Sequence, residues 1–164
     1  MTPDKLLAIA IVPAHVELAN YGIPDTPSAR RLSLTIALQE TGLLHRRQVT
    51  ASGLEDGPAV SWWQFESGPM SGCVEVLTHP ATRAFMAKVC AAHKIAPTPK
   101  GLWEAMRYND IVAACAARLL FYKLPDALPT EPVAGWDQYY RAWHPGKPHP
   151  EKWGPNWKTA SSYL

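Results

Sequence analysis

The expected fold depends on two short stretches of this chain, Gln39-Glu40-Thr41-Gly42 and Gly57-Pro58-Ala59-Val60-Ser61-Trp62-Trp63-Gln64-Phe65-Glu66. The first stretch ends a predicted helix in which Leu32, Ile36 and Glu40 are spaced four residues apart and so share one face. Because the apolar part of that face should pack inward, the helix brings a carboxyl group to a partly buried position. Burial disfavours the charged form and raises the pKa of a carboxyl group, which makes Glu40 a candidate general acid near neutral pH.

Helical segments with clear start and stop signals make up most of the chain. For the helix from Ser28 to about Thr41, Thr26 is the predicted N-cap, Pro27 the first helical residue and Gly42 the stop. Further helices are expected at about residues 3–18, 80–94, 101–122 and 135–143, with a short helix or turn at 74–77. Residues 43–70 lack a helical period and contain several glycines and prolines, so we expect loops there with at most a small β-hairpin or sheet. The predicted fold class is therefore mainly α.

The size and composition of the chain favour one domain. With 164 residues, 47% of them hydrophobic, we expect a single domain over residues 1–164, and a tail rich in Pro and Trp, about 144–164, packed on it. A net charge of +2 and a charged fraction of 18% do not indicate a nucleic-acid partner. No apolar run is long enough for a membrane span, and residues 6–12 are expected to form a core helix rather than an export signal. We expect a soluble monomer.

The cysteines and histidines do not form a recognisable metal motif. Cys90 and His93 have C-x-x-H spacing and His79 lies nearby in sequence, but there is no second pair at zinc-finger spacing and no H-E-x-x-H motif. Three cysteines cannot all pair within one chain, and their apolar neighbours favour buried thiols. We therefore expect neither a metal nor another cofactor.

The two opening stretches resemble those of goose-type lysozymes and soluble lytic transglycosylases. Glu40-Thr41-Gly42 matches the helix-borne Glu followed by a small residue, and Gly57 with Trp63-Gln64-Phe65-Glu66 resembles the later Gly and Gln-hydrophobic segment with its acidic residue. Tyr108-Asn109 is similar to a Tyr-Asn pair of the transglycosylases. The chain as a whole, including Trp143-His144-Pro145-Gly146-Lys147-Pro148, looks like phage-encoded lysozyme-like proteins.

The resemblance implies a lysozyme-like fold and cleavage of the β-1,4 bond between N-acetylmuramic acid and N-acetylglucosamine in peptidoglycan. Glu40 would protonate the leaving oxygen. The substrate-binding residues that the resemblance and the residue types suggest are Gln64, Trp62, Trp63, Tyr108 and Asn109. Since adjacent strand residues point to opposite faces, we expect one of the two tryptophans in the core and the other on the cleft wall.

The second catalytic role has several candidates. Glu66, Glu55 or Asp56 would activate water in an inverting hydrolase, whereas assistance by the N-acetyl group of the substrate would give the 1,6-anhydro product of a lytic transglycosylase. The goose-type pattern places further acids at matching positions, so hydrolysis is favoured. Such an enzyme would stay in the host cytoplasm until lysis, or travel with the virion, and would act on the cell wall in the periplasm.

Structural roles remain open for the same residues. Glu40 is alternatively a salt-bridge partner of Arg46 or Arg47. Ser61-Trp62-Trp63 stands where the family has a glycine, and bulky rings filling the cleft would leave a non-catalytic module that binds cell wall or another phage protein. The C-terminal aromatic residues are expected to fix the tail to the domain, with a glycan-binding surface as the alternative. They are Trp136, Tyr139, Tyr140, Trp143, Trp153 and Trp157.

Overall fold

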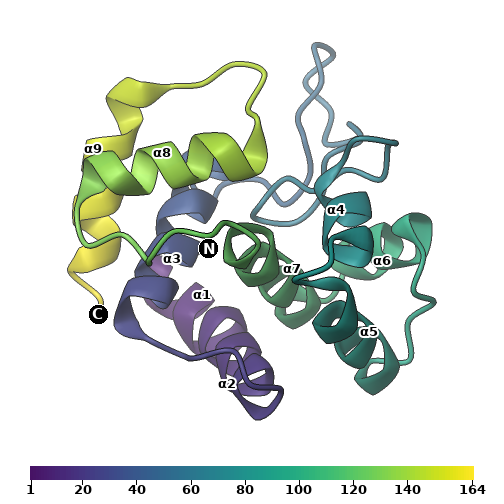
Figure 1. Cartoon of the computed structure of the whole chain (residues 1–164). Coiled ribbons are helices and arrows are strands. Elements are labelled where there is room, and N and C mark those ends of the chain that lie inside the picture. Colours follow the sequence, from purple (N-terminus) through teal and green to yellow (C-terminus); the bar gives the residue numbers. More distant parts are fainter.

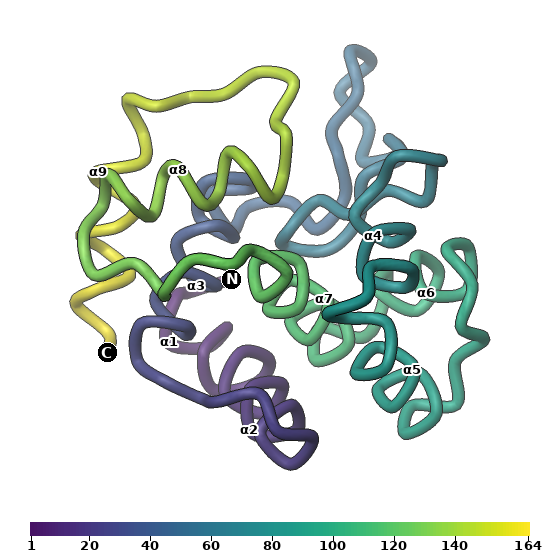
Figure 2. Tube along the Cα trace, viewed as in Figure 1, coloured from purple at the N-terminus to yellow at the C-terminus, as the bar shows by residue number.

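Helices form nearly all of the regular structure in the computed structural model, which describes residues 1–164 (Figures 1 and 2). The bounds, in chain order, are α1 (Pro3–Leu6), the π-helix η1 (Leu7–Ile11), α2 (Val12–Asn20), α3 (Pro27–Thr41), α4 (Gly72–Thr78), α5 (Arg83–Ala92), α6 (Pro99–Met106), α7 (Asp110–Tyr122), α8 (Pro132–Trp143) and α9 (Pro150–Ser161). The prediction of a mainly α fold is confirmed. No helix is both long enough and apolar enough to cross a membrane.

The N-terminal segment is one helical run that packs in the core. Leu6, Ile11 and Leu18 are fully buried, and this run contacts α7. The π-helical turn ends two residues before Pro13, which has no N–H to give to the carbonyl four residues earlier, so the regular α-helical bonding is interrupted there. The expectation of a core helix at residues 6–12 is confirmed.

Helix α7 lies in the middle of the molecule, between α4 to α6 on one side and the N-terminal helices and α3 on the other (Figure 1). Ten of its residues are buried. The prediction of one helix over residues 101–122 is wrong, because the chain leaves the helical conformation at Asn109. The Asn109 carboxamide oxygen accepts hydrogen bonds from the Ile111 and Val112 amides, both at 3.1 Å, and so caps a new helix.

The C-terminal residues form more regular structure than we expected. Residues 144–149 are irregular, but the chain then forms α9, which packs on α3. Its indoles Trp153 and Trp157 are buried, so the expectation that this segment packs on the rest of the protein is confirmed. Pro150 starts the helix at a position where the missing N–H costs nothing, which the sequence pattern alone did not reveal.

Residues 43–70 contain only two isolated antiparallel bridges, Arg47 with Val60 and Val60 with Phe65. In the second, Val60 and Phe65 exchange amide-to-carbonyl hydrogen bonds of 2.9 and 2.8 Å around a tight turn. The long loop before Val60 projects from the helical body (Figure 2). The expected β structure is therefore smaller than a regular hairpin.

Gly135 is the contact point between α8 and α9, and its substitution tests this packing. A Cβ atom at Gly135 would lie 2.4 Å from Trp157 Cζ3, so Gly135→Ala should lower the free energy of unfolding by about 1 to 3 kcal/mol through overpacking. Gly154→Ala is the matched control, because nothing lies within 4 Å of its Cβ position and alanine favours the helix. Urea unfolding of both variants measures the effect. Equal stabilisation by the two alanines would contradict this packing.

Candidate active site

The end of α3 places Glu40 at the edge of a cleft. Thr26 caps the helix by accepting a 3.1 Å hydrogen bond from the Ala29 amide, and Gly42 ends it with a left-handed backbone at φ 57°. Thr41 Oγ1 donates to the Ala37 carbonyl at 2.9 Å, which ties the last turn to the helix. The helix boundaries predicted from Thr26, Pro27 and Gly42 are confirmed.

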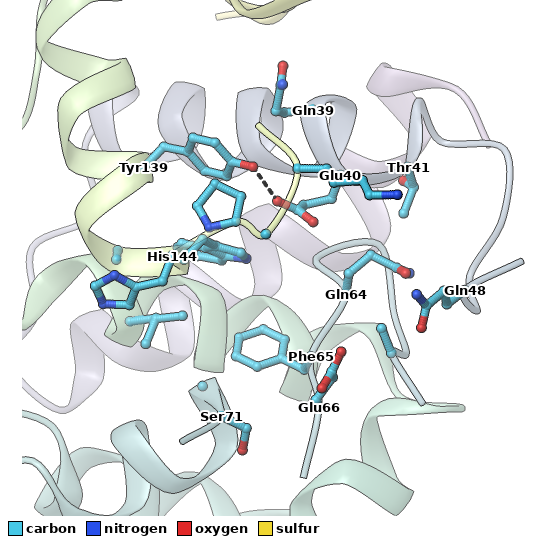
Figure 3. Close-up of a pocket in the computed structure, with 18 of the residues that line it drawn as sticks. Gln39, Glu40, Thr41, Gln48, Gln64, Phe65, Glu66, Ser71, Tyr139 and His144 are labelled. Carbon is cyan, nitrogen blue, oxygen red and sulfur yellow. Dashed lines mark hydrogen bonds between the residues drawn. The ribbon is translucent and has the colours of Figure 1, made fainter. Parts of the chain in front are cut away.

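The cleft has a volume of about 910 Å³ and is lined by several separate parts of the chain. These are the end of α3, His45 with residues 47–49, Ala59 with residues 64–66, the start of α4 with its preceding loop, Leu120 of α7, and the end of α8 with the loop that follows it. Figure 3 shows Glu40 and Tyr139 on one side, with Gln64, Phe65 and Glu66 opposite. Segments far apart in the sequence therefore meet around the Glu40 carboxyl group.

Tyr139 on α8 is the polar partner of Glu40. Its hydroxyl donates a 2.7 Å hydrogen bond to Glu40 Oε1 (Figure 3). Neither Arg46 nor Arg47 pairs with Glu40: Arg46 binds Asp110 Oδ1 at 2.6 Å, and Arg47 Nε donates to the Gly57 carbonyl. The salt-bridge alternative for Glu40 is therefore wrong, because both arginines have other partners.

Burial controls the acidity of Glu40. Desolvation raises its pKa from 4.5 to about 7, and the hydrogen bond from Tyr139 opposes this shift only in part. The same burial, together with the neighbouring carboxylate, raises the pKa of Tyr139, so the tyrosine keeps its proton. Near neutral pH, Glu40 is thus present in both the acid and the carboxylate form, as general acid catalysis requires.

Aromatic rings hold Tyr139 in place. The residue is 3% exposed, and its ring stacks on Trp153 at a centroid distance of 5.1 Å, with Trp143 stacked at 6.2 Å and Trp136 tilted at 5.4 Å. A rigid phenol loses little conformational freedom when it binds the carboxyl group. The buried C-terminal indoles therefore fix the tail, as expected, and they also fix the tyrosine that contacts Glu40.

Gln39 connects the loop after α8 to the same end of α3. Its side-chain amide donates to the His149 carbonyl at 2.9 Å and its oxygen accepts from Asn156 Nδ2 at 2.9 Å. This loop contributes His144, Lys147 and His149 to the cleft. The loop and α9 are thereby anchored next to the candidate acid.

Two further predicted site residues, Gln64 and Glu66, line the cleft. Gln64 has a left-handed backbone at φ 53°, and its side-chain amide donates to the Ser61 carbonyl at 3.0 Å. Glu66 is exposed. The structure thus brings these two residues together with Glu40.

Glu55 and Asp56 do not line the cleft. Glu55 pairs with His45 at 2.8 Å on the projecting loop, and Asp56 accepts from Thr50 Oγ1 at 2.8 Å within the same loop. Both carboxylates therefore have partners within or next to that loop. Of the three acids expected as candidates for the second catalytic role, the structure brings only Glu66 into the cleft with Glu40.

The expectation that one of Trp62 and Trp63 faces the cleft is also wrong. Trp62 is 5% exposed and Trp63 is fully buried, with its Nε1 donating to the Ser33 carbonyl at 2.9 Å. The pair lies in a tight turn between Ser61 and Gln64, both of which have positive φ, so the alternation of side chains along a strand does not apply. Both indoles consequently enter the core.

Tyr108 and Asn109 lie outside the cleft, contrary to the expectation that they bind substrate. Tyr108 is 77% exposed, with the Arg107 guanidinium 5.4 Å from its ring centroid. Asn109 caps α7, and its Nδ2 lies 3.3 Å from His93 Nδ1. Because the helix is interrupted between α6 and α7, Asn109 caps a new helix and Tyr108 lies exposed at the surface.

Several residues that line the cleft were not among the catalytic and substrate-binding residues expected from the sequence. Phe65, Trp143 and His144 surround it together with Tyr139, and Trp143 Nε1 donates to the Trp63 carbonyl at 3.0 Å. The available signal was the run of aromatic residues before His144-Pro145-Gly146, but sequence spacing does not show which distant segment such a run covers.

The residues considered for a metal site have other contacts. His93 Nε2 lies 3.0 Å from Glu17 Oε2, and Cys90 is buried with a raised thiol pKa. The structure contains no group of three or more His, Cys, Asp or Glu side chains arranged to hold a metal ion.

No protein-family model, curated protein or solved structure matches this chain. The lysozyme-like part of the fold prediction therefore stays a prediction. What the structure itself defines is a mainly α protein with an open cleft and one carboxyl group of raised pKa at its edge.

The raised pKa of Glu40 predicts a pH-dependent stability. The folded protein keeps a proton on Glu40 that the unfolded chain releases above pH 4.5, so the free energy of unfolding falls from about pH 4.5 to 7 and then levels off. Glu40→Gln removes this loss and should exceed the parent in stability by up to about 3 kcal/mol at pH 8, with little difference at pH 4.5. Urea unfolding at both pH values measures this, with Glu66→Gln as the exposed control. Parallel pH profiles for parent and Glu40→Gln would contradict the burial of this carboxyl group.

Substitutions of Asn109 test whether this residue caps α7. Asn109→Ala should lower the free energy of unfolding by about 1 kcal/mol because two amides of α7 lose their acceptor, whereas Asn109→Asp keeps the acceptor and should retain most of the stability. Chemical denaturation compares the three proteins. An Asn109→Ala variant as stable as the parent would refute the capping role.

Proposed function

We propose that this protein is a muramidase that cleaves the β-1,4 bond between N-acetylmuramic acid and N-acetylglucosamine, with Glu40 as the general acid. The observation that carries the proposal is a partly buried carboxyl group with a pKa of about 7, held by Tyr139 at the edge of an open 910 Å³ cleft. Glycoside cleavage needs one protonated carboxyl group beside the scissile bond. The sequence resemblance to goose-type lysozymes and lytic transglycosylases supplies the substrate class.

The direction of the Tyr139 hydrogen bond supports this role for Glu40. Because the phenol donates to Oε1, that oxygen is an acceptor, and the acidic proton belongs on Oε2. Oε2 is then the atom that protonates the leaving oxygen of the glycoside. Tyr139 also stabilises the carboxylate that remains after the proton has left.

The cleft lining suits a glycan. Gln48, Gln64 and Ser71 offer hydrogen-bonding groups for sugar hydroxyls and N-acetyl amides, while Trp143 and Phe65 offer apolar ring surface. Its volume lies within the range of about 300 to 1,000 Å³ that is typical of ligand sites. A polar cleft with a few aromatic rings favours a carbohydrate over an apolar ligand.

Glu66 is the best candidate for the second carboxylate. Of the acids that share the cleft with Glu40, Glu75 forms a salt bridge with Lys123, whereas Glu66 is exposed. Activation of water by Glu66 gives an inverting hydrolase. The alternative is a lytic transglycosylase, in which the substrate N-acetyl group takes this role and Glu66 is dispensable.

A binding module without catalysis has less support than the enzyme. That alternative relied on the bulky Ser61-Trp62-Trp63 segment filling the cleft. Because both indoles are buried in the core, they leave the cleft open, and the acid remains at its edge.

Digestion of purified peptidoglycan sacculi tests the assignment. Glu40→Gln removes the proton donor and should reduce the cleavage rate roughly 10²- to 10⁴-fold, while the exposed Glu104→Gln on α6 should cleave like the parent. Loss of turbidity gives the rate, and chromatography with mass spectrometry identifies the muropeptides. Undiminished cleavage by Glu40→Gln, or release of amines instead of glycan ends, would rule out the proposal.

The same digests separate the two mechanisms. New reducing N-acetylmuramic acid ends together with a strong loss in Glu66→Gln indicate hydrolysis with Glu66 as base. 1,6-Anhydro ends that persist in Glu66→Gln indicate transglycosylation. Binding of sacculi without any cleavage by the parent would favour the non-catalytic alternative.

A further inference from the structure

A second, smaller cavity of about 220 Å³ lies between the C-terminal end of α7, the segment before α3 and α8. Its walls are largely apolar and aromatic and include Pro24, Phe121, Tyr122 and Leu128. One buried charged side chain, Arg118, also lines it. The proposed muramidase uses none of these residues.

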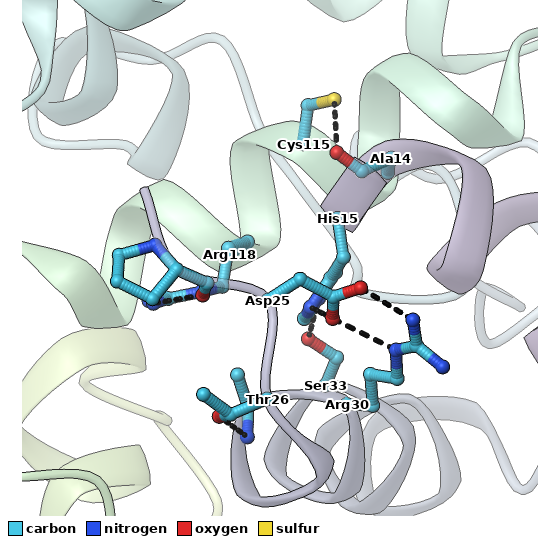
Figure 4. A network of polar contacts seen from close by, with 10 residues as sticks. Ala14, His15, Asp25, Thr26, Arg30, Ser33, Cys115 and Arg118 are labelled. Atoms are coloured by element: carbon cyan, nitrogen blue, oxygen red, sulfur yellow. Dashed lines mark hydrogen bonds and ion pairs between the residues drawn. The ribbon is translucent and has the colours of Figure 1, made fainter. Parts of the chain in front are cut away.

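Arg118 lacks the partners that a buried guanidinium normally has. The residue is 3% exposed, and its Nε and Nη1 atoms have no hydrogen-bond acceptor. Nη2 donates only one long bond of 3.5 Å, to the Pro24 carbonyl (Figure 4). The guanidinium carbon lies 4.9 Å from the Phe121 ring centroid and 5.1 Å from that of Tyr122.

The acids in this region are already paired with other arginines. Asp25 forms its salt bridge with Arg30 (Figure 4), and Asp126, on the cavity wall, binds Arg141 at 2.8 Å. Desolvation lowers the pKa of Arg118 only to about 10, so the group stays charged at neutral pH. A buried charge with no direct counter-ion destabilises the protein, and a bound anion would remove that cost.

We propose that this cavity binds a small carboxylate with an apolar body, whose charge is neutralised by Arg118. The guanidinium matches a carboxylate in both charge and hydrogen-bonding geometry, and the long bond to Pro24 is readily exchanged for a charged acceptor. The apolar body lies against Phe121 and Leu128. The ligand is either a free acid or the C-terminal carboxylate of a peptide.

The size of the cavity limits the ligand. Its volume equals that of roughly seven water molecules and is below the usual range for drug-sized ligands. The site is also separate from the Glu40 cleft: on α7, Leu120 lines the cleft while Arg118 lines this cavity, and residues two apart on a helix do not face the same way. The proposal therefore does not rest on the proposed function.

Thermal unfolding with sodium isobutyrate as the probe tests the proposal. At ten times the dissociation constant, the midpoint of the parent should rise by about 3 to 6 °C relative to sodium chloride at equal ionic strength. Arg118→Met should abolish this rise, and the exposed Arg83→Met on α5 should retain it. An equal rise with chloride, or a rise that persists in Arg118→Met, overturns the proposal, as does the absence of any saturable rise.

A second variant keeps the test decisive if Arg118→Met does not fold. Leu128→Trp leaves Arg118 in place but fills the cavity, so it should also abolish the isobutyrate effect. To distinguish the two ligand sources, a short peptide with a free C-terminus is compared with the same peptide as an amide. Stabilisation by isobutyrate and by the acid peptide, but not by the amide, identifies a peptide terminus. Stabilisation by isobutyrate and by neither peptide identifies a free acid. A ligand effect retained in Leu128→Trp overturns the assignment to this cavity.

Discussion

The hydrogen bond from Tyr139 to Glu40 is the contact on which the candidate site depends, because it joins α8 to the end of α3 on one side of the cleft. It forms only if two conditions hold. Helix α3 must stop at Gly42 so that Glu40 faces the cleft, and the aromatic cluster with Trp153 must hold the tyrosine ring in place. Helix capping, aromatic packing and the acidity of one carboxyl group are therefore coupled in this protein.

The C-terminal segment supports the candidate site through the same contacts. Trp157 on α9 packs beneath the Arg31 guanidinium of α3 at 5.5 Å, and Asn156 binds Gln39 next to Glu40. A segment that looks like a tail in sequence is thus part of the support of the site. Burial of Glu40 follows from that packing, and burial is the main cause of its raised pKa.

Local signals in the sequence predicted the parts of this structure that local physics determines. The boundaries of α3 follow from Thr26, Pro27 and Gly42, and the position of Glu40 follows from its spacing to Leu32 and Ile36. The break at Asn109 was also present as a capping signal, but the alanine-rich sequence after it favoured an uninterrupted helix. The structure shows that the Asn cap outweighs the average helix propensity at this position.

Long-range placement was not predictable in the same way. Two tertiary features decide which of the indoles of Trp62, Trp63 and Trp143 reaches the cleft. One is a tight turn with two positive-φ residues, and the other is the contact between segments about 80 residues apart. The placement of Glu55 and Asp56 on a projecting loop is equally a tertiary property. The alternation of side chains along a strand and proximity in sequence do not predict such contacts. The partial burial of Glu40, in contrast, could be predicted because the residue shares one helix face with apolar residues.

The most direct test of the central claim is a titration of the Glu40 carboxyl carbon by ¹³C NMR, with Glu40→Gln used to assign its signal. The titration midpoint should lie near pH 7, because burial raises the pKa of Glu40 to about 7 against the partial opposition of the Tyr139 hydrogen bond. A midpoint near 4.5, the value of an ordinary glutamate, would contradict the claim that this cleft contains a general acid poised at neutral pH.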